Sequence, residues 1–188
     1  MRKFITLSLL ALVGSVLPAQ STEYSVKTGL VNAQGDMVNL TQRHLGYFFE
    51  GGVKFTLTEP DLSLYVHAGH LTVRAKQEDL ANNCDVKNAW VGLDLLYPVK
   101  TTGLTIFTGP TLNTFDVKAQ KTGAYPDTSW KFGWRLGTKY QITKSVAVDA
   151  VYNFAEWTRF QTKDRLGALQ PMAAYRPSWL TVGVSYTF

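Results

Sequence analysis

Along most of this chain, apolar residues recur at every second position, which is the side-chain period of a β-strand. The clearest example is the last ten residues, WLTVGVSYTF. One face of this segment carries Leu180, Val182, Val184, Tyr186 and Phe188. The opposite face carries only small residues, threonine, glycine and serine, between them. The pattern predicts a terminal strand with one apolar face and one small, polar face.

Eight segments follow this pattern, and they predict eight strands. The segments are residues 24–31, 45–57, 62–75, 87–97, 104–115, 130–142, 146–155 and 179–188. Their connections alternate between short ones, at 58–61, 98–103 and 143–145, and long ones, at 32–43, 76–86, 116–129 and 156–177. Up-and-down barrels of the outer membrane have short turns at one end and longer loops at the other. The chain therefore predicts an all-β fold, an eight-stranded antiparallel up-and-down transmembrane barrel.

Two of the predicted strands contain an irregularity. Within 62–75, the apolar positions change phase near Gly69, which predicts a β-bulge there. Within 104–115, Pro110 lacks the N–H group that the ladder of hydrogen bonds needs. It predicts either a bulge or a local gap in strand pairing.

The first 19 residues differ from the rest and predict a cleaved secretory signal peptide. Arg2 and Lys3 precede an apolar run, and Leu17-Pro18-Ala19 places a small residue before a cleavage point. The run is shorter than the ~20 residues that a membrane-spanning helix needs. We therefore expect residues 1–19 to be the signal peptide and residues 20–188 to form one barrel domain.

The direction of the apolar face separates two kinds of barrel. A soluble carrier barrel would turn it inward, whereas a membrane barrel turns it toward lipid. Here the apolar faces carry aromatic residues toward their ends, as interfacial girdles do. These residues are Tyr97, Trp130, Tyr140, Tyr152, Phe154, Tyr186 and Phe188. The other faces carry glycine and charges of both signs, including Lys27 and His67, so we expect them to face the lumen.

The expected lumen charges form a candidate network, because buried charges need partners. Its members are Glu50, Lys54, Asp94, Lys131, Arg135, Lys139 and Asp149. We expect Arg135 or Lys131 to pair with Glu50 or Asp149 and to fill a lumen that eight strands leave only wide enough for side chains. Such a network would be either a permanent structural element or a switchable gate.

Composition and charge narrow the possible functions. The chain has 15 glycines, 24 aromatic residues (10 Phe, 9 Tyr, 5 Trp) and one cysteine, Cys84, which falls in a predicted loop. A lone cysteine gives no disulfide framework. The formal net charge of +5 is modest and dispersed, and the aromatic residues do not alternate with Lys or Arg, so we expect no nucleic-acid partner.

Catalytic and metal-binding patterns are weak. His67 and His70 point to opposite faces of a regular strand, and no carboxylate or thiol cluster accompanies them in the sequence. The bulge predicted at Gly69 could bring the two rings together, and we expect both histidines to be polar residues of the lumen lining. No histidine lies in the His-x-Ser pattern of the lipid A deacylases. We expect no metal, no cofactor, no catalytic residue and no enzymatic activity.

Two segments, GWRLGTKYQITKSVAVDAVYNF at 133–154 and the terminal WLTVGVSYTF, resemble small bacterial outer-membrane barrels of the opacity-protein and OmpA-transmembrane-domain type. The resemblance implies an integral outer-membrane protein of a Gram-negative bacterium, with its long loops outside and both termini in the periplasm. It also implies that the barrel-assembly machinery recognises Leu180, Val182, Val184, Tyr186 and Phe188. Loss of Phe188 should then impair assembly in the cell more than stability in detergent.

Members of this group act as adhesins, structural anchors or small pores. The resemblance thus implies a structural or surface-interaction role through the external loops, or alternatively a narrow channel for ions or small solutes. The expected partners are outer-membrane lipid, lipopolysaccharide, the assembly machinery and periplasmic chaperones. We expect a monomer.

Overall fold

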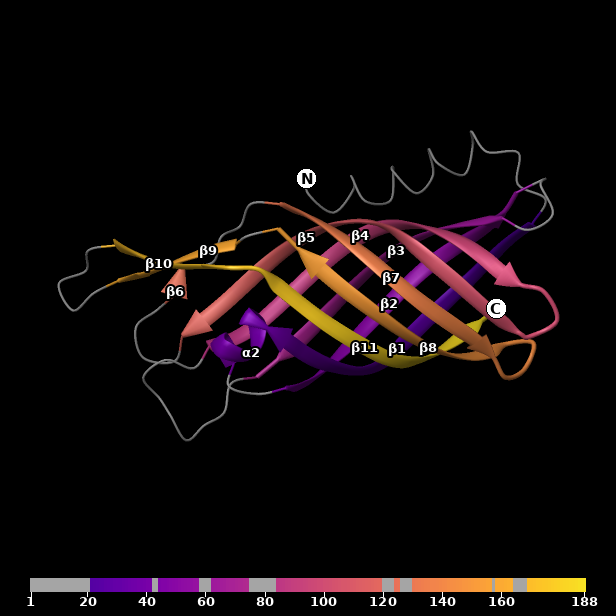
Figure 1. Ribbon diagram of the computed structural model, residues 1–188, viewed down its shortest axis with the longest axis horizontal. Coiled ribbons are helices and arrows are strands. Elements are labelled where there is room, and N and C mark those ends of the chain that lie inside the picture. Colours follow the sequence, from indigo (N-terminus) through magenta and orange to yellow (C-terminus); the bar gives the residue numbers. More distant parts are fainter. Residues whose placement is uncertain are drawn as a thin grey trace.

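The computed structural model describes residues 21–41, 44–57, 62–74, 84–119, 124–125, 130–156, 158–163 and 169–188. Its body is a closed antiparallel barrel in which neighbouring strands follow the order β1-β11-β8-β7-β5-β4-β3-β2 (Figure 1). The barrel strands are β1 (Ser21–Gly35), β2 (Leu45–Thr56), β3 (Ser63–Val73), β4 (Cys84–Val99), β5 (Leu104–Ala119), β7 (Lys131–Gln141), β8 (Val146–Ala155) and β11 (Pro177–Thr187). The predicted fold class is confirmed, and β1 closes the barrel against β11, from Ser25 opposite Thr187 to Gly35 opposite Pro177.

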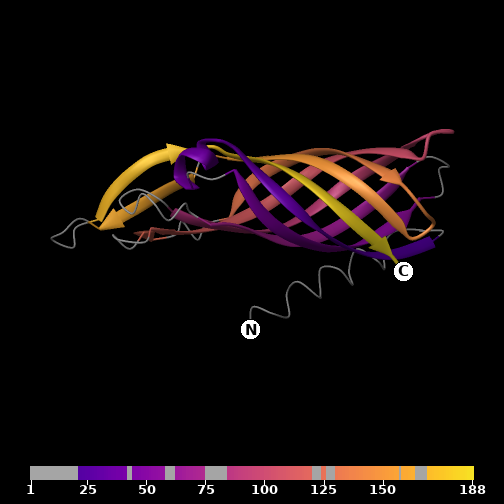
Figure 2. The ribbon, with the colours of Figure 1, turned by 90° about the horizontal axis from the view of Figure 1, so that it is seen from below.

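The two ends of the barrel are built differently. One end, called here the turn end, holds the short connections at 100–103 and 142–145 and the C-terminus (Figure 1). The other, called the loop end, carries α2 (Asp36–Thr41) and a small sheet of strand order β10-β9-β6 (Figures 1 and 2). That sheet consists of β6 (Ala124–Tyr125), β9 (Thr158–Lys163) and β10 (Leu169–Tyr175).

The loop end contains more secondary structure than predicted for the long connections at 32–43 and 156–177, of which only 156–160 was considered as an extension of a strand. Strand β1 continues to Gly35 and is followed by a helix, and β9 and β10 form an antiparallel pair. Beyond the apolar belt, the outer face of a strand no longer meets lipid, so its residues need not alternate between apolar and polar. Cys84 likewise begins β4, opposite Ala119, and does not lie in a loop. The predicted turn at 58–61 lies outside the described residues, and so does the predicted signal peptide, which stays a prediction.

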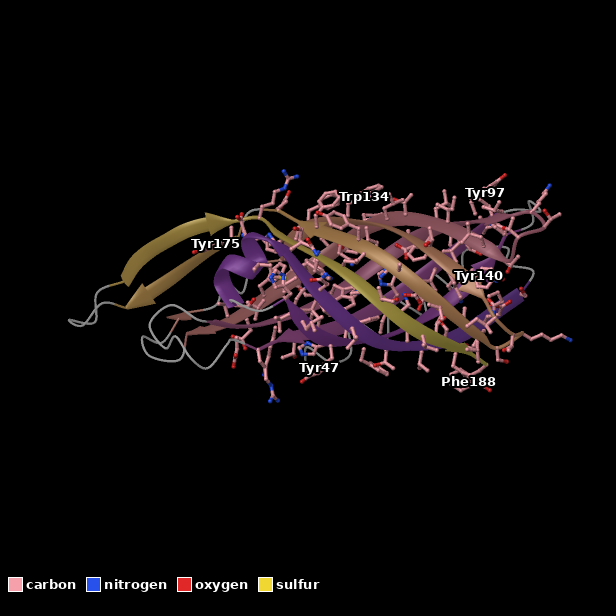
Figure 3. The ribbon with its side chains drawn as sticks, turned by 60° about the horizontal axis from the view of Figure 1, so that its bottom comes forward. Tyr47, Tyr97, Trp134, Tyr140, Tyr175 and Phe188 are labelled. Carbon is pink, nitrogen blue, oxygen red and sulfur yellow. The ribbon has the colours of Figure 1, made fainter. Side chains whose placement is uncertain are left out.

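The apolar faces point outward, as predicted for a membrane barrel. Leu30, Leu45 and Leu136 are each more than half exposed, as are Tyr140 and Phe188. Figure 3 shows Tyr97, Tyr140 and Phe188 projecting near the turn end, and Tyr47 and Trp134 nearer the loop end. This is the arrangement of two aromatic girdles. No helix among the described residues is long and apolar enough to cross a membrane.

The prediction of a β-bulge at Gly69 is wrong. Gly69 pairs in unbroken register with Glu50 on β2 and with Trp90 on β4. The inward face of β3 keeps the same phase throughout, but at the loop end it carries the buried Leu71 and Val73. The apolar residues change face there because the interior itself becomes apolar, without any change in the backbone.

Pro110 causes a gap and not a bulge. It pairs with Trp134 on β7 in continuous register. On the other side, pairing with β4 stops after Gly92 opposite Thr111 and resumes at Leu95 opposite Thr108 with the register unchanged. The missing N–H therefore interrupts the ladder locally and leaves the strand order intact.

Candidate functional site

The loop-end half of the barrel interior is filled by an apolar cluster, called here the apolar plug. Its members are Val31, Ala33, Met37, Phe48, Leu71, Val73, Val86, Trp90, Phe115, Val117, Ala155 and Trp179, all buried. The rings of Phe115 and Trp179 meet edge to face with centroids 6.1 Å apart. Met37 comes from α2, so the helix packs into the mouth of the barrel and covers the plug. Buried apolar side chains that pack together in this way form a dry part of the interior.

On the turn-end side of the apolar plug, the interior is charged, and Arg135 is at the centre of this charged part. The Arg135 Nη1 donates to Oε2 of Glu50 at 2.6 Å, and its Nε donates to the two Asp94 carboxylate oxygens at 2.8 and 3.0 Å. All three residues are at most 2% exposed. The guanidinium on β7 is thus held between carboxylates of β2 and β4, from across the lumen. The charge-assisted bonds satisfy groups that would be costly to bury alone.

Lys27 adds a second cation to this group. Its Nζ lies 3.4 Å from Oε1 of Glu50 and 3.1 Å from Oδ1 of Asp149. The ring of Phe107 supports both cations, with Lys27 Nζ 5.7 Å and Arg135 Cζ 5.4 Å from its centroid. Two cations therefore face three carboxylates, so with a neutral histidine this group carries one net negative charge.

His67 lies inside the same group, which we call the charged cluster: Lys27, Glu50, His67, Asp94, Arg135 and Asp149. Its Nδ1 is 3.6 Å from Oε2 of Glu50, and its Nε2 is 3.5 Å from Oδ1 of Asp94. The imidazole stacks on Tyr65, with centroids 5.4 Å apart. In the part of the chain that the structure describes, no group of three or more His, Cys, Asp or Glu is placed to hold a metal ion.

His70 does not line the lumen, contrary to the prediction. It is exposed on the outer face of β3, with Nε2 3.2 Å from Oγ1 of Thr72. The regular register of β3 explains this, because residues three apart on an unbulged strand face opposite sides.

At the turn end, the interior opens into a vestibule of two adjoining hollows of about 40 and 100 Å³. Both are lined by Glu23, Lys54, Leu96, Lys139 and Thr187. Each has room for only a few water molecules. The smaller hollow also reaches the charged cluster. Water from the turn end can therefore approach the cluster but meets the apolar plug behind it.

The structure separates the predicted network into three places. Glu50, Asp94, Arg135 and Asp149 lie together in the charged cluster, whereas Lys54 and Lys139 line the vestibule. Lys54 lies 3.2 Å from Glu23, and Lys139 makes no ion pair with any described carboxylate. Lys131 begins β7 at the loop end, opposite Asn113 and about 13 Å along the strand from Arg135.

Sequence reasoning left Lys27 and His67 out of the network, as well as Trp90, whose Nε1 donates to Oε2 of Glu50 at 3.3 Å. Their inward phase was visible in the sequence, but their partners were not. Neighbours across a lumen depend on the stagger of the strands, which a single sequence does not reveal.

The terminal strand places its five predicted signal residues on the outer face. Val182, Val184, Tyr186 and Phe188 are exposed and Leu180 is half-buried. The N–H of Phe188 donates to the carbonyl of Tyr24 at 2.9 Å, and its ring meets that of Tyr186 edge to face at 5.1 Å. The chain end is thus fixed at the β1–β11 seam.

Comparison with known proteins agrees with this architecture. The family model described as "Outer membrane protein beta-barrel domain" matches residues 4–188. Neisserial surface protein A (NspA) has a similar structure, with a TM-score of 0.55, 17% identity and coverage of 90% of this chain and 99% of that one. OprG from Pseudomonas aeruginosa has a TM-score of 0.56 and 13% identity, covering 90% and 97%.

Ail, the attachment invasion locus protein of Yersinia pestis, has a TM-score of 0.54 and 10% identity, covering 89% of this chain and 97% of that one. At such identities the likeness concerns the fold. Comparison with curated proteins finds no match. From its closed barrel, its outward apolar belt and a family match over nearly its whole length, the chain belongs to the outer membrane protein beta-barrel domain family and is an integral outer-membrane protein.

Proposed function

We propose that this protein is a non-conducting surface protein, not a pore or an enzyme, and that it presents its loop end outside the cell for interaction with other molecules. The observation that carries the proposal is the closed interior. The apolar plug fills the loop-end half, and the charged cluster joins β1, β2, β3, β4, β7 and β8 across the middle. An eight-stranded barrel has about enough room for such a filling and no more.

The shape of the loop end supports its role as the interacting part. It carries α2 and the β10-β9-β6 sheet beyond the barrel, whereas the connections that the structure describes at the turn end are short (Figures 1 and 2). Barrels of this kind keep short turns in the periplasm and longer segments outside, and binding residues concentrate in such segments. We therefore place the loop end outside and both termini in the periplasm.

Two of the proteins with a similar fold are named as a surface protein and an attachment invasion locus protein. These names are in keeping with a surface role, although the likeness itself lies in the fold. The proposal further takes the protein to be a monomer held in outer-membrane lipid and lipopolysaccharide. It keeps the terminal strand as the signal read by the assembly machinery and periplasmic chaperones.

Ion-current recording in planar bilayers tests the proposal against a narrow channel. The wild-type protein should show no conductance steps, because the plug interrupts the water path. Steady ohmic steps in the wild type would instead establish the channel. Glu50→Ala and Arg135→Ala test the gate hypothesis, since conductance in these variants alone would mean that the charged cluster holds a gate shut.

Orientation is tested separately on intact cells. An epitope tag inserted between β9 and β10 should bind antibody on unbroken cells. The same tag inserted at 100–103 should bind only after the outer membrane is permeabilised. The opposite pattern would overturn the placement of the loop end.

A further inference from the structure

Arg176 is a cationic residue on the outside of the barrel at the loop end. It lies between β10 and β11, directly after Tyr175, which Figure 3 shows close to α2. Its backbone N–H donates to Oδ2 of Asp36 at 2.9 Å, which ties this point of the chain to the first residue of α2. Its exposed guanidinium lies over the ring of Phe154, with Cζ 5.9 Å from the centroid. The backbone is thus anchored while the charge faces outward.

A hollow of about 290 Å³ lies beside this guanidinium. The described residues that line it are Tyr152, Phe154, Arg176 and Ser178. Phe154 is paired with Ser178 across the β8–β11 ladder, so the hollow is on the lipid-facing side of these two strands. It combines one cation, two aromatic rings and two hydroxyl groups, those of Tyr152 and Ser178, the composition expected where the apolar belt meets the head-group region.

An apolar strip runs from the hollow toward the turn end. Its successive outward pairs are Tyr152 with Leu180, Ala150 with Val182, Val148 with Val184, and Val146 with Tyr186. From Ser178 to Tyr186 the strand covers about 26 Å at the usual rise, before tilt. The hydrocarbon core of a bilayer is ~30 Å thick, so the strip is long enough for a lipid chain that starts at the hollow.

The guanidinium of Arg176 is not used to hold the loop end together, because the Asp36 carboxylate accepts the backbone N–H of Arg176 instead. Its guanidinium makes no ion pair with any described carboxylate, and its contact is the Phe154 ring. A guanidinium presents a planar fork of N–H donors that fits phosphate oxygens, and stacking on the ring leaves the edges of the fork free. A phosphate group just outside the apolar belt would satisfy both the charge and the donors.

We propose that Arg176, with Phe154, Tyr152 and Ser178, forms a binding site for lipid A, the phosphorylated lipid of the outer leaflet. A lipid A phosphate binds the Arg176 guanidinium, and an acyl chain lies along the strip between β8 and β11. The placement of this site in the outer leaflet rests on the proposed function, in which the loop end lies outside the cell. The chemistry of the site depends only on the residues at the hollow.

The test is lipid retention by the purified full-length protein in nanodiscs, measured by native mass spectrometry. The lipids are bisphosphorylated lipid A, dephosphorylated lipid A and phosphatidylglycerol. Wild-type protein should retain bisphosphorylated lipid A best. Arg176→Ala should weaken this retention roughly tenfold, the effect of losing one charge-assisted contact. Arg176→Lys should lose less, because it keeps the charge but not the planar fork.

Lys144→Ala is the matched control, because it removes an exposed cation at the turn end. It should leave retention unchanged. Equal retention of lipid A by the wild type and Arg176→Ala would overturn the proposal, and so would equal retention of the two forms of lipid A. Displacement of lipid A by millimolar inorganic phosphate would show a simple anion site and overturn the lipid assignment.

These outcomes are separable from failure of the proposed function. Nanodisc retention does not depend on which way the protein faces in the cell. If the epitope tags show the reverse orientation while Arg176 still selects bisphosphorylated lipid A, the site stands and the proposed orientation fails. Preferred retention of phosphatidylglycerol over lipid A would then identify the inner-leaflet lipid and overturn the assignment to lipid A.

Discussion

The two halves of the barrel interior are made by the same strands but by opposite chemistry. On β3, Leu71 enters the apolar plug while His67 enters the charged cluster, four residues further toward the turn end. On β4, Val86 and Asp94 are divided in the same way. The inward phase does not change along either strand. A barrel can therefore be closed by dry packing at one end and keep a charged interior that only the other end reaches.

The comparison also shows what stabilises each half. The apolar plug is stabilised because its side chains are removed from water. Shortening one of these side chains lowers stability further because it leaves a cavity. The charged cluster gains little from being buried, yet it is costly to break, because one missing partner leaves a buried charge without compensation. The two halves should thus respond differently to substitutions of similar size.

The largest effect is expected from breaking the charged cluster. Arg135→Ala leaves Glu50 and Asp94 buried without their shared cation, which should lower the free energy of unfolding by about 3–5 kcal/mol. Reversible urea unfolding in lipid vesicles measures it. Lys139→Ala is the control, since Lys139 makes no ion pair with a described carboxylate and should change the value little. A loss below ~1 kcal/mol for Arg135→Ala would mean that water compensates the cluster.

A slightly smaller effect is expected from opening a cavity in the plug. Leu71→Ala, at a side chain that is 0% exposed, should cost about 2–5 kcal/mol in the same unfolding experiment. Leu93→Ala is the matched control because Leu93 faces lipid, which can fill the vacated space. If both variants lose the same amount, the loop-end half is not packed as described.

Overpacking next to the boundary between the halves should cost less again. A Cβ at Gly69 would overlap the indole of Trp90, so Gly69→Ala should lower the unfolding free energy by about 1–3 kcal/mol. Gly51→Ala provides the comparison, since the atom nearest to a Cβ there, the carbonyl oxygen of Ser25, would be 3.9 Å away. Similar stabilities for the two variants would argue that Trp90 can move aside.

The smallest effect is expected at the mouth of the vestibule. Lys54 and Glu23 form an ion pair whose side chains are 32% and 41% exposed. Exposed pairs contribute roughly 0–1 kcal/mol, so Lys54→Ala should change stability by less than that, and salt should reduce the change further. A loss as large as that of Arg135→Ala would show that the charged cluster extends to the vestibule rim.

Sequence reasoning reached the fold because lipid imposes a strict rule on one face of each strand. The outward residues of β7, from Phe132 to Tyr140, had to be apolar or small enough for lipid, so strand number and facing followed from alternation. Prediction failed where the outer face no longer meets lipid. This is the case for β1 beyond Val31, for α2 and for the β9–β10 pair, which all lie past the apolar belt. On β3, Leu71 and Val73 of the apolar plug are apolar although they face inward. The sequence pattern therefore predicted a bulge that the strand does not contain.

The candidate site was predictable only as a set of inward charges. That Arg135 and not Lys131 meets Glu50, and that Asp149 meets Lys27, depends on where the staggered strands place these residues across the lumen. Residues on the same inward face of one strand are interchangeable in a sequence pattern. In the barrel, four residues along β7 separate the charged cluster from the loop end.

The most direct test of the divided interior is the rate at which single cysteines react with a small, water-soluble methanethiosulfonate reagent. In a Cys84→Ser background, Lys139→Cys reports on the vestibule and Ala33→Cys on the apolar plug, where Ala33 is 0% exposed. In the folded protein, Lys139→Cys should be modified rapidly, whereas Ala33→Cys should be protected until the protein is unfolded. Comparable rates at the two positions in the folded protein would show a continuous water path and rule out a divided interior.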